Sequence, residues 1–278
     1  MSNTLQSPVL EPQLPTPESP LQVVLEFDSP EAQSVLEYVD SKALAWAMSL
    51  IDLSGVDEST RNHMYRVGFA AAETAKRLGM DPTQVQNSFL GGILHDLGKG
   101  DPDVLEAINY NGPLDPERRA IVDRHSALGA RFIIEHGFTT GDESQQFENK
   151  RCHALTLSIA AIALGHHMYN AKHPYPTTEE IRKLVDEGVV NAGEMLKLLA
   201  GARSKVTKIV SAVDIVDAVT EHRPYRKKDI GLWEAFNIVE QEVPTVGSDV
   251  IGAVMSSYMH GISPVSDVHH SEVTVIAA

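Results

Sequence analysis

Helix start and stop signals recur along the body of this chain, and they constrain its fold more than any other feature. Ser29 followed by Pro30 is a typical helix start, because the hydroxyl caps free backbone N–H groups and proline fits the first turn. Gly79 and Gly137 follow apolar-periodic segments, where glycine commonly ends a helix. The sequence has no sustained alternation of apolar and polar residues of the kind that strands show. It therefore predicts an all-α body.

The helical pattern also suggests how the chain is divided. Five prolines among polar residues predict a disordered tail over residues 1–20, followed by an N-terminal helical element over 21–56. The main domain is expected over 57–261, and a flexible tail over 262–278. Helices are predicted at 57–78, 82–97, 116–136, 154–167, 177–187, 192–199, 204–220, 232–241 and 248–259. The longer connections, 139–151 and 177–203, could cover or reshape a cleft.

Composition excludes several classes of protein. A single cysteine, Cys152, excludes an internal disulfide framework and a multi-cysteine zinc site. The formal net charge of −15 argues against broad binding to nucleic acid, whose phosphates would be repelled. Apolar runs fall short of a membrane span, and the N-terminus lacks a basic region followed by an apolar stretch. We expect a cytoplasmic protein with no membrane partner.

The most informative dipeptide is His95-Asp96, which lies in the segment Gly-Gly-Ile-Leu-His-Asp-Leu-Gly-Lys and is followed by Lys99. A neutral imidazole nitrogen and a carboxylate oxygen together suit borderline divalent metals. A lysine nearby can meet an anionic substrate. The pair therefore indicates a metal ion held beside a phosphate.

Other histidines and acidic residues can join this pair. His63 and His125 are expected within helices, and Gly129 would allow a neighbour to pack closely beside His125. Asp214 lies in an apolar stretch, where a buried charge costs several kcal/mol unless it is paired or bound to metal. Asp217 shares its helical face, so one of the two could bind metal while the other orients a ligand. Seven candidate ligands suit two octahedral metals with bridging solvent: His63, His95, Asp96, His125, His166, His167 and Asp214.

The order of these residues resembles that of the HD superfamily of metal-dependent phosphohydrolases. The segment 212–226, Ala-Val-Asp-Ile-Val-Asp-Ala-Val-Thr-Glu-His-Arg-Pro-Tyr-Arg, is similar to the signature of its HD-GYP branch, the bacterial cyclic di-GMP phosphodiesterases of signalling. The likeness covers residues 57–259 and implies a helical HD domain with a binuclear site of iron or manganese. It also implies that a hydroxide bridging the metals, with Asp96 shared between them, attacks phosphorus.

The same resemblance suggests the substrate contacts. Lys99 would stabilise charge on the phosphorus, and Tyr175 would stack on the substrate or donate a hydrogen bond to it. Arg223 and Arg226 would grip a phosphate, since a guanidinium fork matches its oxygens. The basic segment 222–228 is also compatible with a merely solvated turn. The helices before residue 57 could serve a regulatory role or form a homodimer.

The chain departs from the branch in the loop that gives it its name. Its pattern, His-His-Glu, two residues, Asp-Gly, one residue and Gly-Tyr-Pro, aligns with residues 166–176, where both histidines, the tyrosine and the proline are kept. The Glu, the Asp and both Gly are replaced by Met168, Ala171, Lys172 and Pro174. Ser59 stands where some members carry an extra carboxylate ligand, which argues against a third metal.

Three functions follow, and the altered loop separates them. The first is hydrolysis of cyclic di-GMP, favoured by the segment Arg-Pro-Tyr-Arg at 223–226. The second is hydrolysis of another nucleotide or phosphoester, favoured by the loop. The third is a sensing or interaction module that keeps the metal site with little or no turnover. All seven candidate ligands are present, which favours a working enzyme.

Overall fold

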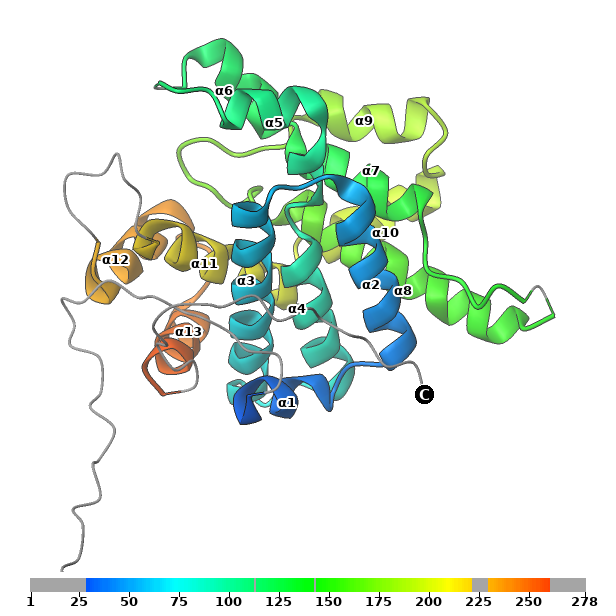
Figure 1. The fold of residues 1–278 in the computed structure, drawn as a ribbon, viewed down its shortest axis with the longest axis horizontal. Coiled ribbons are helices and arrows are strands. Elements are labelled where there is room, and N and C mark those ends of the chain that lie inside the picture. The colour runs from blue at the N-terminus through cyan, green and yellow to red at the C-terminus, as the bar shows by residue number, and fades with distance from the viewer. Residues whose placement is uncertain (1–28, 113, 143, 222–229, 261–278) are drawn as a thin grey trace, which may run out of the picture.

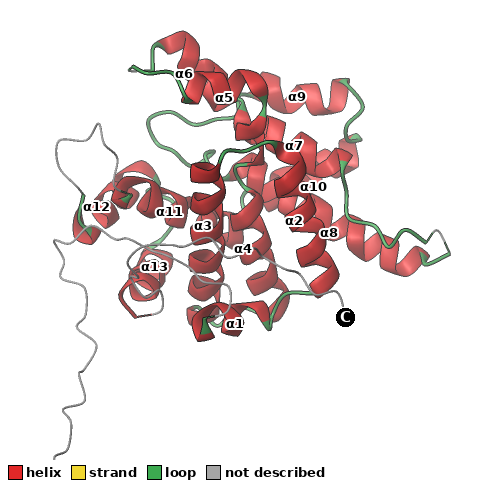
Figure 2. Cartoon of the chain, in the orientation of Figure 1, coloured by secondary structure: helices red, strands yellow, loops and turns green. Residues whose placement is uncertain are grey.

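The computed structural model describes residues 29–112, 114–142, 144–221 and 230–260, and within these ranges every regular element is a helix (Figures 1 and 2). The all-α prediction is therefore confirmed. The predicted tails, 1–20 and 262–278, lie outside the described residues, as do Arg223 and Arg226. In the part of the chain that is described, no helix has both the length and the apolar character needed to cross a membrane.

The described ranges contain thirteen α-helices and one short 3-10 helix, η1. They are α1 (Pro30–Leu36), α2 (Ser41–Ser54), α3 (Glu58–Arg77), α4 (Pro82–Leu94), η1 (Leu97–Gly100), α5 (Pro102–Ile108), α6 (Pro116–Asp123), α7 (His125–Glu135), α8 (Gln146–Gly165), α9 (Thr178–Asp186), α10 (Ala192–Gly201), α11 (Lys205–Thr220), α12 (Leu232–Glu242) and α13 (Ser248–His260).

Helices α3 and α4 form the centre of the bundle, with α2 and α8 on one side and α11 to α13 on the other (Figure 1). The two central helices approach closely at Gly68 and Gly92, where a Cβ on Gly92 would lie 2.5 Å from the Gly68 Cα. Asp57 caps α3 by accepting from the Thr60 N–H at 2.8 Å, and Asp81 forms a capping box with Gln84 at the start of α4. The paired helices give the rigid frame on which the candidate site is built.

Helix α4 ends earlier than the sequence predicted. We expected a helix over 82–97, but the α-helix stops at Leu94 and the chain tightens into η1. Gly98 brings η1 against α7, since a Cβ there would lie 2.0 Å from the His125 carbonyl oxygen. The expected close packing at Gly129 is confirmed, because its own Cβ would lie 3.1 Å from the Gly98 nitrogen. This contact fixes His95 and Asp96 next to the start of α7.

The segment 116–136 forms two helices instead of the one predicted, and His125, expected in the middle of a helix, is instead the first residue of the second one. Helix α6 ends at Asp123 and α7 begins at His125. The His125 ring donates from Nδ1 to the Val122 carbonyl at 2.7 Å, a local bond of the kind that competes with helical hydrogen bonding. The break aims the imidazole at the centre of the bundle.

The start of α8 and the presence of α5 also differ from expectation. Helix α8 begins at Gln146, eight residues before the predicted start, so the second half of the expected connection 139–151, from residue 146 on, is helical. Helix α5 was not predicted, although Asp101 accepts from the backbone N–H groups of Asp103 and Val104 and Pro102 opens the first turn. The sequence carried these signals, but seven residues are too few for an apolar period to stand out.

Candidate metal centre

The seven predicted ligands converge from five helices onto one point of the bundle. The structure places His63 on α3, His95 and Asp96 after α4, His125 at the start of α7, His166 and His167 after α8, and Asp214 on α11. Their side chains form three overlapping trios whose ligand atoms lie within 4.8 Å of one another: His63, His95 and Asp214; His95, Asp96 and His166; and His125, His166 and His167. Burial is nearly complete, and only His167 has a partly exposed ring.

Asp96 occupies the middle of the cluster, and its two oxygens face different histidines. Oδ2 lies 3.2 Å from the His95 Nε2 and 3.6 Å from the His63 Nε2. Oδ1 lies 3.2 Å from the His125 Nε2 and 3.8 Å from the His166 Nε2. One carboxylate thus joins two groups of ligands, as a bridging ligand between two metals would.

Three of the rings are oriented by backbone carbonyls. The Nδ1 atoms of His95, His125 and His166 lie 2.7, 2.7 and 2.8 Å from the carbonyl oxygens of the residues three positions earlier. A carbonyl can only accept, so each Nδ1 carries a proton and each ring turns its Nε2 into the cluster. This is the ring orientation that a metal ligand needs, fixed before any metal binds.

Several of these atoms lack partners that a folded protein normally supplies. His95 Nε2 and Asp96 Oδ1 are buried and accept no hydrogen bond among the described residues. The Nε2 atoms of His125 and His166 face each other at 3.2 Å, although both rings donate from Nδ1 to carbonyls. Lone pairs at this distance repel unless a cation lies between or beside them. The donor set of imidazole nitrogens and carboxylate oxygens therefore fits divalent transition metals.

The sequence left open which of Asp214 and Asp217 faces the site and which orients a ligand. In the structure they contact opposite sides of the His63 ring. Asp214 Oδ1 lies 3.0 Å from the His63 Nε2, on the side of the ring that faces the cluster. Asp217 Oδ2 lies 2.7 Å from the Nδ1 of the same ring, on the opposite side. Asp217 thus orients His63, while Asp214 offers its oxygens to the site.

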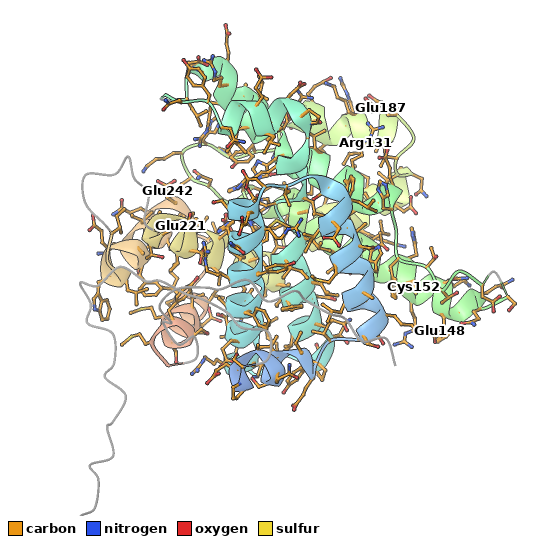
Figure 3. All side chains as sticks on the ribbon, in the orientation of Figure 1. Arg131, Glu148, Cys152, Glu187, Glu221 and Glu242 are labelled. Carbon is orange, nitrogen blue, oxygen red and sulfur yellow. The ribbon has the colours of Figure 1, made fainter. Side chains whose placement is uncertain are left out.

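Arg66 completes this arrangement, and sequence reasoning missed it. Its guanidinium binds both oxygens of Asp217, with Nη2 at 2.8 Å from Oδ2, and also reaches Glu221 at 2.9 Å. Glu221 follows α11 and is labelled in Figure 3. The signal was available, because Arg66 lies three residues after His63 and so shares its face of α3.

The electrostatic environment differs between the two sides of the cluster. Burial alone would lower the pKa of His95, but Asp96 and Asp214 raise it to about 10, and the Asp214 and Asp217 carboxylates likewise raise the pKa of His63. Burial holds the pKa of His166 well below its usual range and lowers that of His167 to about 3. The His95 and Lys99 cations keep the pKa of Asp96 well below its ordinary value despite burial. Without metal, the cluster therefore holds ionised carboxylates beside a protonated His95, whereas His166 and His167 stay neutral.

Two of the four predicted substrate-contacting residues, Lys99 and Tyr175, lie beside the cluster. Lys99, on η1, directs its ammonium group to Asp96 Oδ2. The Tyr175 ring packs at 4.4 Å from the His167 ring and at 5.7 Å from the His125 ring, measured between centroids. Burial and nearby carboxylates raise the pKa of the Tyr175 phenol, so the hydroxyl stays protonated. Arg223 and Arg226 lie outside the described residues, and their position is not tested.

An all-helical bundle with clustered histidines and aspartates defines a class of metal-site proteins, and a family comparison identifies which one. Residues 60–219, more than half of the chain, match the HD domain family. The chain belongs to this family. The matched region begins just before His63 and ends just after Asp217, so it includes the whole cluster.

Two curated relatives are cyclic di-GMP phosphodiesterases. One, from Pseudomonas aeruginosa, is 26% identical over 205 residues, which are 72% of this chain and 41% of the relative. The other, from Thermotoga maritima, is 28% identical over 186 residues, or 66% of this chain and 40% of the relative. The chain thus spans about two fifths of the length of each.

Solved structures of similar shape include the HD domain of the phosphodiesterase PgpH from L. monocytogenes. Its complex with cyclic-di-AMP has a TM-score of 0.41 and 14% identity, and covers 84% of this chain and 97% of that chain. A second solved structure of the same PgpH domain is similar to this chain with a TM-score of 0.40.

Proposed function

We propose that this chain is a metal-dependent phosphodiesterase that hydrolyses cyclic di-GMP. The observation that carries the proposal is the position of Asp96, whose two oxygens face two separate pairs of histidines. Two curated relatives bear the same activity in their names, which supports this substrate over other phosphoesters. We also propose action in the cytoplasm and a homodimer formed through the helices before residue 57.

In this proposal two metals, iron or manganese, are shared by the seven ligands. Asp96 would touch both, with His63, His95 and Asp214 on one side and His125, His166 and His167 on the other. When bound, such metals neutralise phosphate oxygens and lower the pKa of water towards about 7. The orphaned His95 Nε2 and Asp96 Oδ1 support this assignment, because both are buried without a hydrogen-bond partner among the described residues.

The remaining residues bind and orient the phosphate. Lys99, already beside Asp96, would place its ammonium charge against an oxygen of the phosphate as negative charge develops. Tyr175, kept protonated by burial, would donate a hydrogen bond or offer its ring to the substrate. Arg223 and Arg226 would hold a second phosphate oxygen through their guanidinium groups.

A second candidate is hydrolysis of another nucleotide or phosphoester. It is favoured by the loop 168–176, where Tyr175 lies against His167 and occupies space on the open side of the cluster. A loop that narrows the site would favour a smaller substrate than a cyclic dinucleotide.

One experiment distinguishes these functions. The protein loaded with manganese or iron is incubated with cyclic di-GMP, its linear dinucleotide and simple nucleotides, and the products are separated by chromatography. Hydrolysis of cyclic di-GMP that is abolished in Asp96→Ala supports the proposal. Hydrolysis of nucleotides alone supports the second candidate, and tight binding of cyclic di-GMP without turnover supports a sensing module.

A further inference from the structure

The loop 168–176 joins α8 to α9 and runs along the open side of the candidate centre. In Figure 1 it is the yellow-green loop that arches between α12 and the α5–α6 pair before it reaches α9. It contributes no ligand to the cluster, since His166 and His167 precede it. Its contacts with neighbouring helices therefore determine how it lies over the metal ligands.

One side of the loop is bound to α12. The Ala171 N–H donates to the Glu242 carbonyl at 2.7 Å, and the Lys172 ammonium lies 2.6 Å from the carboxylate of the same residue. Figure 3 labels Glu242 on the side of the molecule where α12 lies. Asn170 stiffens this part by accepting the backbone N–H groups of Lys172 and His173, each at 3.0 Å.

The other side of the loop is bound to the end of α6 by one side chain. His173 donates from Nε2 to Asp123 Oδ2 at 2.5 Å. The Asp123 carboxylate is buried, and Arg119 Nε lies 3.2 Å from its other oxygen. A buried carboxylate left with one partner fewer costs free energy, so Asp123 holds His173 more firmly than an exposed ion pair would.

This contact also determines where Tyr175 lies. The rings of His173 and Tyr175 are 5.9 Å apart between centroids, and Tyr175 in turn packs on His167. Tyr175 is buried, although it belongs to an otherwise largely exposed loop. Release of His173 from Asp123 would free the segment that carries Tyr175 while leaving every residue of the cluster in place.

We propose that His173 is a positioning residue, which latches the loop 168–176 to Asp123 and thereby holds Tyr175 against His167 as one wall of the substrate site. This inference rests on the proposed function for its kinetic consequence, but the latch itself is a property of the free protein. The latch determines how tightly substrate binds, whereas the ligands determine the chemical step.

Hydrogen exchange of the loop amides tests the latch without substrate. In His173→Ala, the backbone amides at positions 171, 172 and 173 should exchange about tenfold faster or more. The reason is that the side-chain hydrogen bond to the charged Asp123 is lost. His173→Gln should exchange within about threefold of the wild type, since its amide N–H can still reach Asp123. Exchange in α8 should stay unchanged in both variants, and the thermal midpoint of His173→Ala should fall by about 2–4 °C at most.

A matched control is His153→Ala. His153 lies 2.9 Å from Glu194 and joins α8 to α10, so it loses the same kind of contact at a different place. It lies 13 residues before His166, or about 20 Å along the helix. Loop exchange at the wild-type rate in His173→Ala, or equal acceleration in His153→Ala, would overturn the latch.

Steady-state kinetics with cyclic di-GMP then test the role in substrate binding. We expect His173→Ala to raise KM about tenfold, with kcat within about threefold of the wild type and metal content unchanged. His173→Gln should restore KM. A fall in kcat with unchanged KM would contradict the positioning role. Failure of the wild type to hydrolyse cyclic di-GMP would instead reject the proposed function, and the exchange result would still decide the latch.

Discussion

The two sides of the candidate centre use the same kind of residue in opposite electrostatic settings. On the side of α3, α4 and α11, Asp214 and Asp217 raise the pKa of His63, and Asp96 and Asp214 raise that of His95, although burial opposes both shifts. On the side of α7 and α8, His166 and His167 are buried among other rings, and their pKa values are lowered. We refer to these as the carboxylate side and the histidine side.

If the proposed two metals bind, the difference gives each of them unlike surroundings. The carboxylate side already balances positive charge with aspartates, so a metal there competes with protons on His63 and His95. On the histidine side His166 and His167 stay neutral, so a metal bound to them displaces no proton. Asp96 belongs to both sides, and its two oxygens couple them.

The largest expected effect comes from removing the group that the two sides share. Asp96→Ala should lower hydrolysis by about a thousandfold or more, because several kcal/mol of transition-state stabilisation depend on the metals it holds. Metal content should fall on both sides. Metal analysis beside a hydrolysis assay checks this, and retention of full metal content with full activity would contradict the bridging role.

Loss of a ligand from one side should spare the other. We expect His125→Ala to lose metal from the histidine side and keep about one ion per chain, and His63→Ala to do the same on the carboxylate side. Hydrolysis should fall in both, by about a hundredfold or more, because each metal stabilises charge on the phosphate. Titration of the apo protein with manganese measures the sites, and a complete loss of metal in both variants would show that the sides are not separable.

A smaller effect is expected from the residue behind His63. Asp217→Asn should weaken metal binding about 10- to 100-fold on the carboxylate side, since it no longer orients the ring as an ionised acceptor. The matched control is Asp52→Asn, which affects an exposed pair with Arg61 at 3.3 Å. Competition with a chelator measures the affinity. Equal affinities in the two variants would show that Asp217 does not act through His63.

The smallest effect is expected at Gly98, the glycine that brings η1 against α7. It is an effect on the free energy of unfolding. Gly98→Ala should lower the free energy of unfolding by about 1–3 kcal/mol, because the added Cβ would lie 2.0 Å from the His125 carbonyl oxygen. Gly252→Ala is the control, since its Cβ would meet nothing within 4 Å on α13 and alanine favours a helix. Urea unfolding of both variants measures the difference, and equal stabilities would contradict the close contact.

The sequence identified the residues that the structure brings together, because metal chemistry restricts residue type more than position, and their role as ligands stays a prediction. The residues His63, His95, Asp96 and Asp214 were identified by their chemistry, and the helices that carry them by capping signals such as Asp57 and Ser204. The function of Asp217 was left open, because helical spacing gives a shared face but not which atom a side chain contacts. The structure resolves this through the two nitrogens of His63.

Other features depend on contacts between distant segments, which spacing along the chain does not encode. The break before His125 depends partly on such a contact, the approach of Gly98. It also depends on a local one, the hydrogen bond from the His125 ring to the Val122 carbonyl. The pairs formed by Arg66 with Glu221 and by His173 with Asp123 join residues that are 155 and 50 positions apart. One sequence offers no signal for the second of these pairs.

The number of metal ions held by the folded chain tests the central claim most directly. Purified protein is stripped, reloaded with manganese and analysed by mass spectrometry for metal per chain, with Asp96→Ala measured in parallel. The two-sided centre predicts about two ions in the wild type and less than one in the variant. A single ion in the wild type, unchanged in Asp96→Ala, would contradict it.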